Sequence, residues 1–138
     1  MLRDLVPGKS YTIEAVVRDD MCATFEGRTV HPVYATWWLV YHMELAGRML
    51  LEPHLEPHEN GVGGGISVEH RAPALVGTRV RVTATVESNE NGKLWCAVIA
   101  ESATRTLAEG RFLQIILAKE RIASIFAAAE RDVARSER

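Results

Sequence analysis

The stretch that most constrains the fold runs from His31 to Leu51 and is apolar on almost every side. A helix on a protein surface has one apolar stripe and a polar face, whereas this stretch leaves no wide polar sector. Its uninterrupted apolar run is too short to cross a bilayer, and His42, Glu44 and Arg48 interrupt it. We therefore expect a helix that is enclosed by the rest of the protein.

Two polar residues of this helix could face one cleft. Thr36 and Glu44 are eight residues apart, so their side chains point within about a quarter-turn of each other, about two turns apart along the axis. A carboxylate kept out of water has a raised pKa unless a partner compensates. Each residue also has a structural interpretation, because Thr36 could cap the helix and Glu44 could pair with Arg48 or reach solvent.

Composition narrows the class of protein. The 138 residues suit one domain, which we place at residues 1–138. A net charge of −2 with mixed signs argues against a nucleic-acid partner. The N-terminus lacks the apolar core of a signal peptide, and no later run suits a membrane, so we expect a cytoplasmic protein. Cys22 and Cys96 lack metal-ligand spacing, so we expect buried, reduced thiols and no metal.

Alternating apolar residues predict a first strand before the helix and further antiparallel strands after it. The mixed segment 19–30 is interpreted as a lid or rim, and a bulge is expected at Glu109 and Gly110. Apolar residues at helical spacing predict an amphipathic C-terminal helix over Lys119 to Ala134. The expected strands cover Ser10 to Arg18, Gly61 to Ala72, Thr78 to Glu87, Lys93 to Glu101, and Thr106 to Leu117.

This order of elements predicts an α+β fold. One long antiparallel sheet can curl around an apolar helix and keep its polar face outward. A helix held in a rolled sheet is the hotdog arrangement. In such a sheet, alternation places His70 on the inward face together with Ile66 and Val68. A lone inward histidine is often no more than a hydrogen-bonded core residue.

A glycine cluster at Gly61, Gly63, Gly64 and Gly65 precedes His70. It could be only a flexible entry to the strand. Alternatively, the missing side chains let a ligand approach backbone amides that bind a developing negative charge. The cluster leads into a strand and lacks the GxxxxGK[ST] pattern, so it is not a phosphate loop. The chain also lacks a GxSxG elbow and a convincing thiol nucleophile.

Together these residues resemble the hotdog-fold thioesterases related to fluoroacetyl-CoA thioesterase. The likeness rests on VYAT at residues 33–36, Glu44 eight residues on, LEP followed by the glycine run, and the inward His70. It implies that Thr36, Glu44 and His70 are catalytic and that glycine amides at Gly63 and Gly64 bind the acyl end. It also implies a homodimer that hydrolyses an acyl-CoA near the subunit interface and needs no cofactor beyond the coenzyme A of its substrate.

One position departs from this family. Members specific for fluoroacetate carry a bulky aromatic lid just ahead of the helix, where this chain has Val30. We therefore expect hydrolysis of a short or otherwise unassigned acyl-CoA, with Glu44 acting either as base for water or as nucleophile. The alternatives are a binding protein without turnover and an enoyl-CoA hydratase. The hydratase is disfavoured because His31 and Pro32 lack the aspartate of its DxNPxH-like segment.

Overall fold

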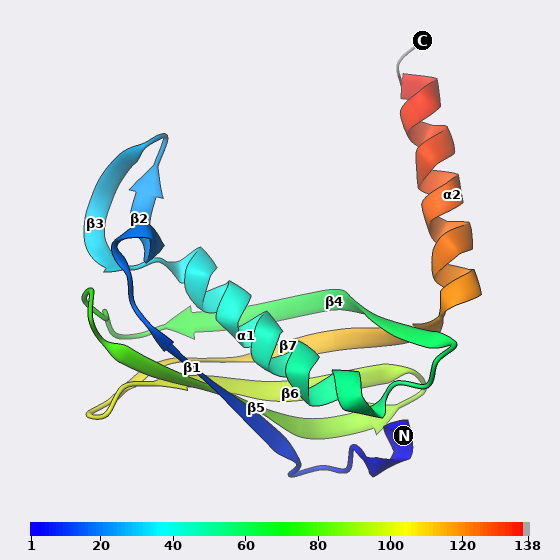
Figure 1. Cartoon of the computed structure of the whole chain (residues 1–138), viewed down its shortest axis with the longest axis horizontal. Helices are drawn as coiled ribbons and strands as arrows, with labels where there is room; N and C mark the ends of the chain where they lie inside the picture. Colours follow the sequence, from blue (N-terminus) through cyan, green and yellow to red (C-terminus); the bar gives the residue numbers. More distant parts are fainter. Residues whose placement is uncertain (137–138) are drawn as a thin grey trace.

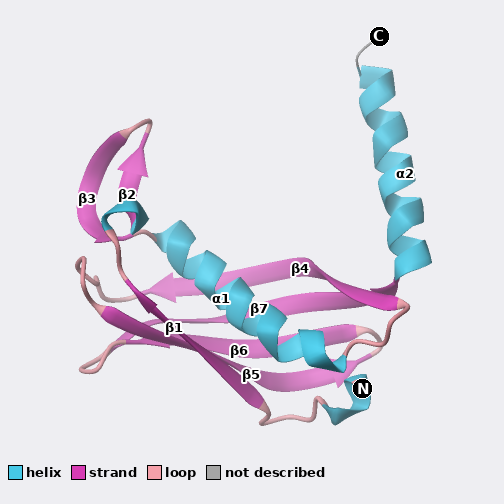
Figure 2. Ribbon diagram, in the orientation of Figure 1, coloured by secondary structure: helices cyan, strands magenta, loops and turns pink. Residues whose placement is uncertain are grey.

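The computed structural model describes residues 1–136, which form an α+β fold (Figures 1 and 2). A five-stranded antiparallel sheet has the order β1-β5-β6-β7-β4, and β2 and β3 form a separate hairpin. The strands are β1 (Ser10–Val16), β2 (Cys22–Phe25), β3 (Arg28–Tyr34), β4 (Glu59–His70), β5 (Arg79–Glu90), β6 (Lys93–Glu101) and β7 (Thr106–Ala118). The helices are α1 (Thr36–Leu51) and α2 (Lys119–Ser136), with short 3-10 turns at Leu2–Asp4, Asp19–Met21 and Glu52–His54.

The core lies between α1 and the concave face of the sheet. Strand alternation turns every second residue of β5 and β6 toward the helix, and those residues are buried. Leu39, Met43 and Ala46 of α1 are fully buried against them. The predicted hotdog arrangement, with a central helix on a curled sheet, is therefore confirmed.

The central helix differs from its prediction in two ways. It begins at Thr36, because residues 28–34 pair with β2 as strand β3, and Ala35 keeps an extended backbone at the N-cap. It is also not enclosed on all sides. The sheet covers one face only, and the opposite face leaves Trp37 44%, Tyr41 51% and Met49 38% exposed. The sheet thus wraps the helix as predicted, but the expectation that the rest of the chain encloses the helix on every side is not met in the single chain.

The segment 19–30 comprises a short turn, β2 and the first residues of β3, and the β2–β3 hairpin stands out from the body (Figure 1). Glu26 and Gly27 make its tip with positive φ angles of 53° and 78°. Phe25 pairs directly with Arg28 across the hairpin, and the pairing becomes irregular at Val30, which lies between the partners of Ala23 and Thr24. The segment interpreted as a lid or rim therefore forms part of a protruding hairpin.

The bulge expected at Glu109 and Gly110 is absent from the pairing of β4 with β7, where both residues stay in register. The irregularity lies instead between Gly63 and Gly65. Gly110 serves another purpose, because a Cβ at this position would collide with the carbonyl of Ser67 on β4. Glycine here permits the close approach of two backbones.

The C-terminal helix was predicted correctly as amphipathic, but among residues 1–136 no other element covers its apolar side. It projects away from the sheet, and none of its described residues is buried (Figure 1). No helix among residues 1–136 is long and apolar enough for a membrane span. Cys22 and Cys96 are buried and free, and burial raises the pKa of Cys96 to about 11.

Candidate active site

The start of α1 meets the end of β4 through a side-chain contact between Thr36 and His70. Thr36 Oγ1 lies 2.9 Å from His70 Nδ1, a hydrogen bond between residues 34 positions apart in the chain. β3 and the bond from the Tyr34 amide to the Ala74 carbonyl, 2.8 Å long, fix the backbone just ahead of Thr36. Two of the three predicted catalytic residues are therefore brought together.

The environment of His70 favours its neutral form. Burial lowers the pKa of His70, and the backbone carbonyl of Ala72 offsets part of this effect. A neutral imidazole can accept the Thr36 proton at Nδ1 while Nε2 carries the hydrogen. His70 Nε2 is buried and has no hydrogen-bond partner among the described residues. The pair faces a hollow of about 260 Å³ that His31 and Arg71 also line.

Glu44 lies further along α1, beside the glycine-rich part of β4. Its carboxylate atom Oε1 is 3.9 Å from the position that a Cβ on Gly63 would occupy. The side chain is exposed, contrary to the expectation of a carboxylate out of water, because the face of α1 that carries it has no cover in the single chain. Within residues 1–136, Glu44 makes no hydrogen bond or ion pair with Thr36 or His70, and the helical rise separates it from Thr36 by about 12 Å along the axis.

The remaining predicted positions lie around this region. Gly63 and Gly64 are exposed on β4, which is the edge strand of the sheet. Val30 on β3 is 49% exposed, and Phe25 on β2 is 58% exposed. Phe25 packs edge-on against Trp37 with ring centroids 5.2 Å apart. Phe25 is therefore an exposed aromatic residue of the hairpin that contacts the first turn of α1.

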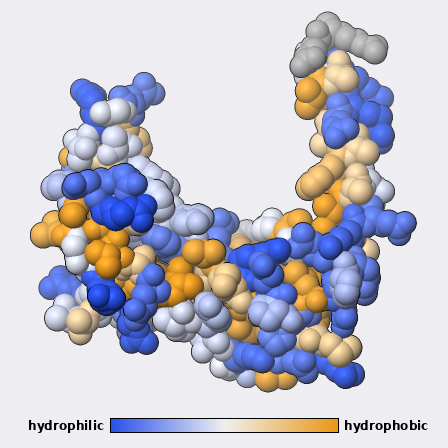
Figure 3. Space-filling view, viewed as in Figure 1, coloured by the Kyte–Doolittle hydropathy of each residue, from blue (hydrophilic) through white to orange (hydrophobic). Residues whose placement is uncertain are grey.

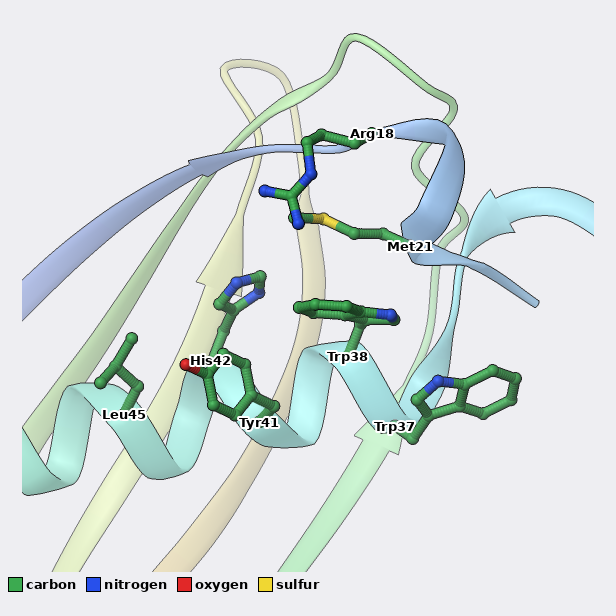
Figure 4. A pocket seen from close by; sticks show the side chains of 7 residues that line it. All are labelled: Arg18, Met21, Trp37, Trp38, Tyr41, His42 and Leu45. Atoms are coloured by element: carbon green, nitrogen blue, oxygen red, sulfur yellow. The ribbon is translucent and has the colours of Figure 1, made fainter. Parts of the chain in front are cut away.

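A second hollow on the other flank of α1 was missed from the sequence. It has a volume of about 600 Å³ and lies between α1 and the turn after β1. Figure 4 shows Arg18 and Met21 reaching over the rings of His42 and Trp38. The buried His42 shares a hydrogen bond with the Tyr34 hydroxyl, and burial, then the nearby Arg18 charge, lowers the pKa of His42. In the sequence, the one indication of this pair is a histidine within an otherwise apolar helix.

Comparison with known proteins identifies the family. Residues 17–120 match the model of the fluoroacetyl-CoA-specific thioesterase family, which is most of the described chain. The chain belongs to the fluoroacetyl-CoA-specific thioesterase family. Membership confirms the predicted resemblance, and the family's description agrees with the predicted class of enzyme, a thioester hydrolase.

A curated member of this family gives a partial match. The chain is 33% identical over 89 residues to the fluoroacetyl-CoA thioesterase of Streptantibioticus cattleyicolor. The matched part spans 64% of each of the two sequences. The matched part is therefore just under two thirds of the length of the curated relative.

Solved structures extend the likeness to nearly the whole chain. A hypothetical protein of Thermus thermophilus, described as a thioesterase superfamily member, is 38% identical, with a TM-score of 0.91 over 95% of this chain and 97% of that one. A variant of the fluoroacetyl-CoA thioesterase FlK in complex with acetyl-CoA is 25% identical, with a TM-score of 0.81 over 90% and 98% of the two chains. A hot-dog-like protein from Thermanaerovibrio acidaminovorans, 18% identical with a TM-score of 0.85 over 93% and 96% of the two chains, agrees in fold.

Proposed function

We propose that this protein is a cytoplasmic homodimer that hydrolyses a small acyl-CoA thioester to the free acid and coenzyme A. The observation that carries the proposal is the 2.9 Å contact between Thr36 and His70 at the start of α1. It orients a neutral imidazole and a hydroxyl beside the helix that also carries Glu44. Family membership supports the reaction class.

Glu44 is assigned as general base or nucleophile. In the first route its carboxylate takes a proton from water, the water oxygen bonds to the thioester carbon, and the C–S bond breaks. In the second route a carboxylate oxygen itself displaces the thiolate and leaves an anhydride that water then hydrolyses. In both routes the coenzyme A thiolate receives a proton. The absence of a side chain at Gly63 leaves room beside Glu44 for the ester.

Thr36 and His70 are assigned assisting roles. A neutral His70 can polarise water or, when protonated, supply the proton for the leaving thiolate. The Thr36 hydroxyl holds the ring by its bond to Nδ1. Backbone amides at Gly63 and Gly64 are proposed to bind the carbonyl oxygen of the acyl group as it gains negative charge.

The homodimer supplies what the single chain lacks around Glu44. β4 is a 12-residue edge strand with a free side, and such an edge readily pairs with another chain. Pairing of two β4 strands would cover the exposed face near Glu44 and remove water from it.

The substrate is proposed to be a short acyl-CoA without selectivity for fluoroacetyl. The solved FlK complexes contain acetyl-CoA in one case and fluoroacetate in another. This chain has the smaller Val30 at the position of the aromatic lid that the family resemblance implies. A smaller, exposed side chain there leaves the acyl end less tightly enclosed.

The test is release of free thiol from acyl-CoAs of graded length by the purified protein. We expect activity on short chains, a loss of at least 100-fold in kcat/KM for Glu44→Gln, and 10-fold or more for His70→Ala. The matched control Glu90→Gln removes an exposed carboxylate from the far turn and should leave the rate unchanged. Rates near wild type in Glu44→Gln would overturn the assignment of Glu44.

A protein that binds acyl-CoA without turnover would behave differently in the same assay. It would release no thiol over hours, while acyl-CoA would still raise its melting temperature by mass action. That combination would overturn the proposed enzyme activity but would still agree with the proposed acyl-CoA binding site.

A further inference from the structure

The C-terminal helix α2 carries an apolar stripe that nothing in the described chain covers. Its apolar residues share one side of the helix and include Ile125, Phe126 and Val133, which are 42%, 60% and 57% exposed. The opposite side carries charged and small residues. An amphipathic helix of this kind normally buries its apolar side, so α2 has the form of a helix that packs on another surface.

α2 begins at the opposite end of β4 from the Thr36–His70 pair. Ala118, the last residue of β7, pairs with Glu59, the first residue of β4, and the Lys119 amide donates to the His58 carbonyl over 2.8 Å. The twelve residues of β4 then run about 36 Å before reaching His70. α2 points away from the sheet (Figure 1). It therefore cannot reach the Thr36–His70 pair of its own chain.

A hollow separates the two projecting parts of the molecule. Figure 3 shows the β2–β3 hairpin on one side and α2 on the other, with the apolar surface of α2 turned toward the space between them. The free edge of β4 lies along the floor of this hollow in the view of Figure 1. A second copy that pairs with β4 must therefore meet α2.

Two-fold symmetry decides which part of that second copy lies against α2. Antiparallel pairing of two full β4 strands puts Glu59 of one chain opposite His70 of the partner subunit. The first turn of α2 then lies beside the partner's His70 and Thr36. The 18 residues of α2 extend about 27 Å from that point, which is long enough to cross the end of the partner.

The end that carries His70 also has apolar side chains that the single chain leaves exposed. Leu75 and Val76, in the loop between β4 and β5, are 61% and 45% exposed, and Trp37 next to Thr36 is 44% exposed. The loop is held to the base of the hairpin by a bridge between Val33 and Leu75. An apolar patch of this kind is suited to cover by an apolar helix.

We infer that α2 of each subunit crosses to the other and covers the Thr36–His70 end of its partner's active site. This inference rests on the proposed homodimeric thioesterase. Each site is then completed in trans, and the stripe of α2 forms an apolar wall that keeps water away from the bound acyl group. Phe126, the largest and most exposed member of the stripe, is the residue of that wall expected to limit acyl length.

Mixing two variants tests whether α2 acts in trans. The first carries Ile125→Asp and Phe126→Asp in α2 with an intact Thr36, Glu44 and His70. The second carries His70→Ala with an intact α2. Each variant alone should lose at least 10-fold in kcat/KM, but subunit exchange between them should restore about a quarter of wild-type activity. Restoration is expected because random exchange makes half of the dimers heterodimers. Each heterodimer has one intact site covered by an intact helix, so a quarter of all sites are active.

Controls separate this inference from its assumptions. Ser124→Asp with Ala128→Asp adds the same two charges to the opposite side of α2, where both residues are exposed, and should leave activity unchanged. Failure of the exchanged mixture to recover, with an active wild-type dimer, would overturn the crossing of α2. A wild-type protein without thiol release would instead overturn the proposed function.

A cross-link supplies a measurement that does not depend on activity. One preparation carries Leu75→Cys and the other Phe126→Cys, while the native Cys22 and Cys96 are buried. After subunit exchange, a flexible thiol-to-thiol reagent should give a covalent dimer containing one copy of each variant. The same reagent on Leu75→Cys mixed with Ser124→Cys, on the opposite side of the helix, should give several-fold less. Equal yields from the two mixtures would contradict the packing of the stripe.

Discussion

His42 and Tyr34 form a buried polar pair within the apolar side of α1. The His42 side chain is 6% exposed, and its Nδ1 shares a hydrogen bond with the Tyr34 hydroxyl. A neutral imidazole accepts this proton, whereas a protonated ring has no free acceptor. Burial, followed by the Arg18 charge, lowers the pKa of His42, and burial raises the pKa of Tyr34. Both residues are therefore held in their neutral forms.

The titration of His42 predicts how the free energy of unfolding depends on pH. Above about pH 6.5 the ring is neutral in both states, so it adds no pH dependence. Below that value the unfolded chain binds a proton that the folded chain does not, and stability falls by up to about 1.4 kcal/mol per pH unit. Urea unfolding between pH 8 and 5 measures this slope. The slope should be smaller in His42→Gln, and an equal slope in that variant would contradict the assignment.

Val30 lies on the hairpin ahead of α1, where the proposed function places the acyl end of the substrate. Its side chain is 49% exposed, and that of Phe25 on the same hairpin is 58% exposed. Val30→Phe should add an aromatic ring ahead of α1 and raise the ratio of kcat/KM for fluoroacetyl-CoA over acetyl-CoA by 10-fold or more, since a closed pocket discriminates small groups better. The paired control Val30→Leu adds volume without an aromatic ring. An unchanged ratio in Val30→Phe would remove Val30 from the acyl pocket.

At the scale of elements, the pairing of β4 with β7 depends on Gly110, which pairs with Val68, two residues before His70. Gly110 lets the carbonyl of Ser67 approach its backbone, and a Cβ there would collide with that carbonyl. Gly110→Ala should therefore push the strands apart and lower the free energy of unfolding by about 1–3 kcal/mol. The control Ser67→Ala shortens an exposed side chain and keeps the carbonyl in place. Chemical denaturation compares the two, and equal stabilities would show that the pairing adjusts freely.

Strand alternation and helical spacing predicted most elements, because each periodic pattern matches one buried face. β5 and β6 show this directly, since their alternate residues are buried. The hairpin could not be predicted in the same way, because β2 and β3 pair mainly with each other and show little burial periodicity. Strand alternation and the family resemblance together predict that Thr36 and His70 lie near each other. The exposure of Glu44 could not be predicted, because the apolar residues of α1 suggested a cover that the single chain does not provide.

At the scale of the whole molecule, apolar surface remains on every part that surrounds the free edge of β4. The uncovered face of α1, the tip of the hairpin and the stripe of α2 all expose large apolar side chains. A stable monomer rarely leaves this much apolar surface around an unpaired strand. The proposed homodimer would cover all three surfaces at once, since a two-fold interface uses the same patch on both subunits.

Gly65 lies near the middle of β4, where a two-fold axis relating two fully paired strands would pass. A Cβ on Gly65 meets no atom within 4 Å in the single chain, so Gly65→Lys should leave the fold of each subunit intact. In the dimer the same substitution brings two ammonium groups together beside the axis, where like charges repel. We expect sedimentation to give a dimer for the wild type and a dissociation constant at least 10-fold higher for Gly65→Lys. The control Thr104→Lys, on an exposed turn away from β4, should remain as dimeric as the wild type. A wild-type monomer at micromolar concentration, or a dimer that is indifferent to Gly65→Lys, would rule out pairing along β4 and with it the covered Glu44.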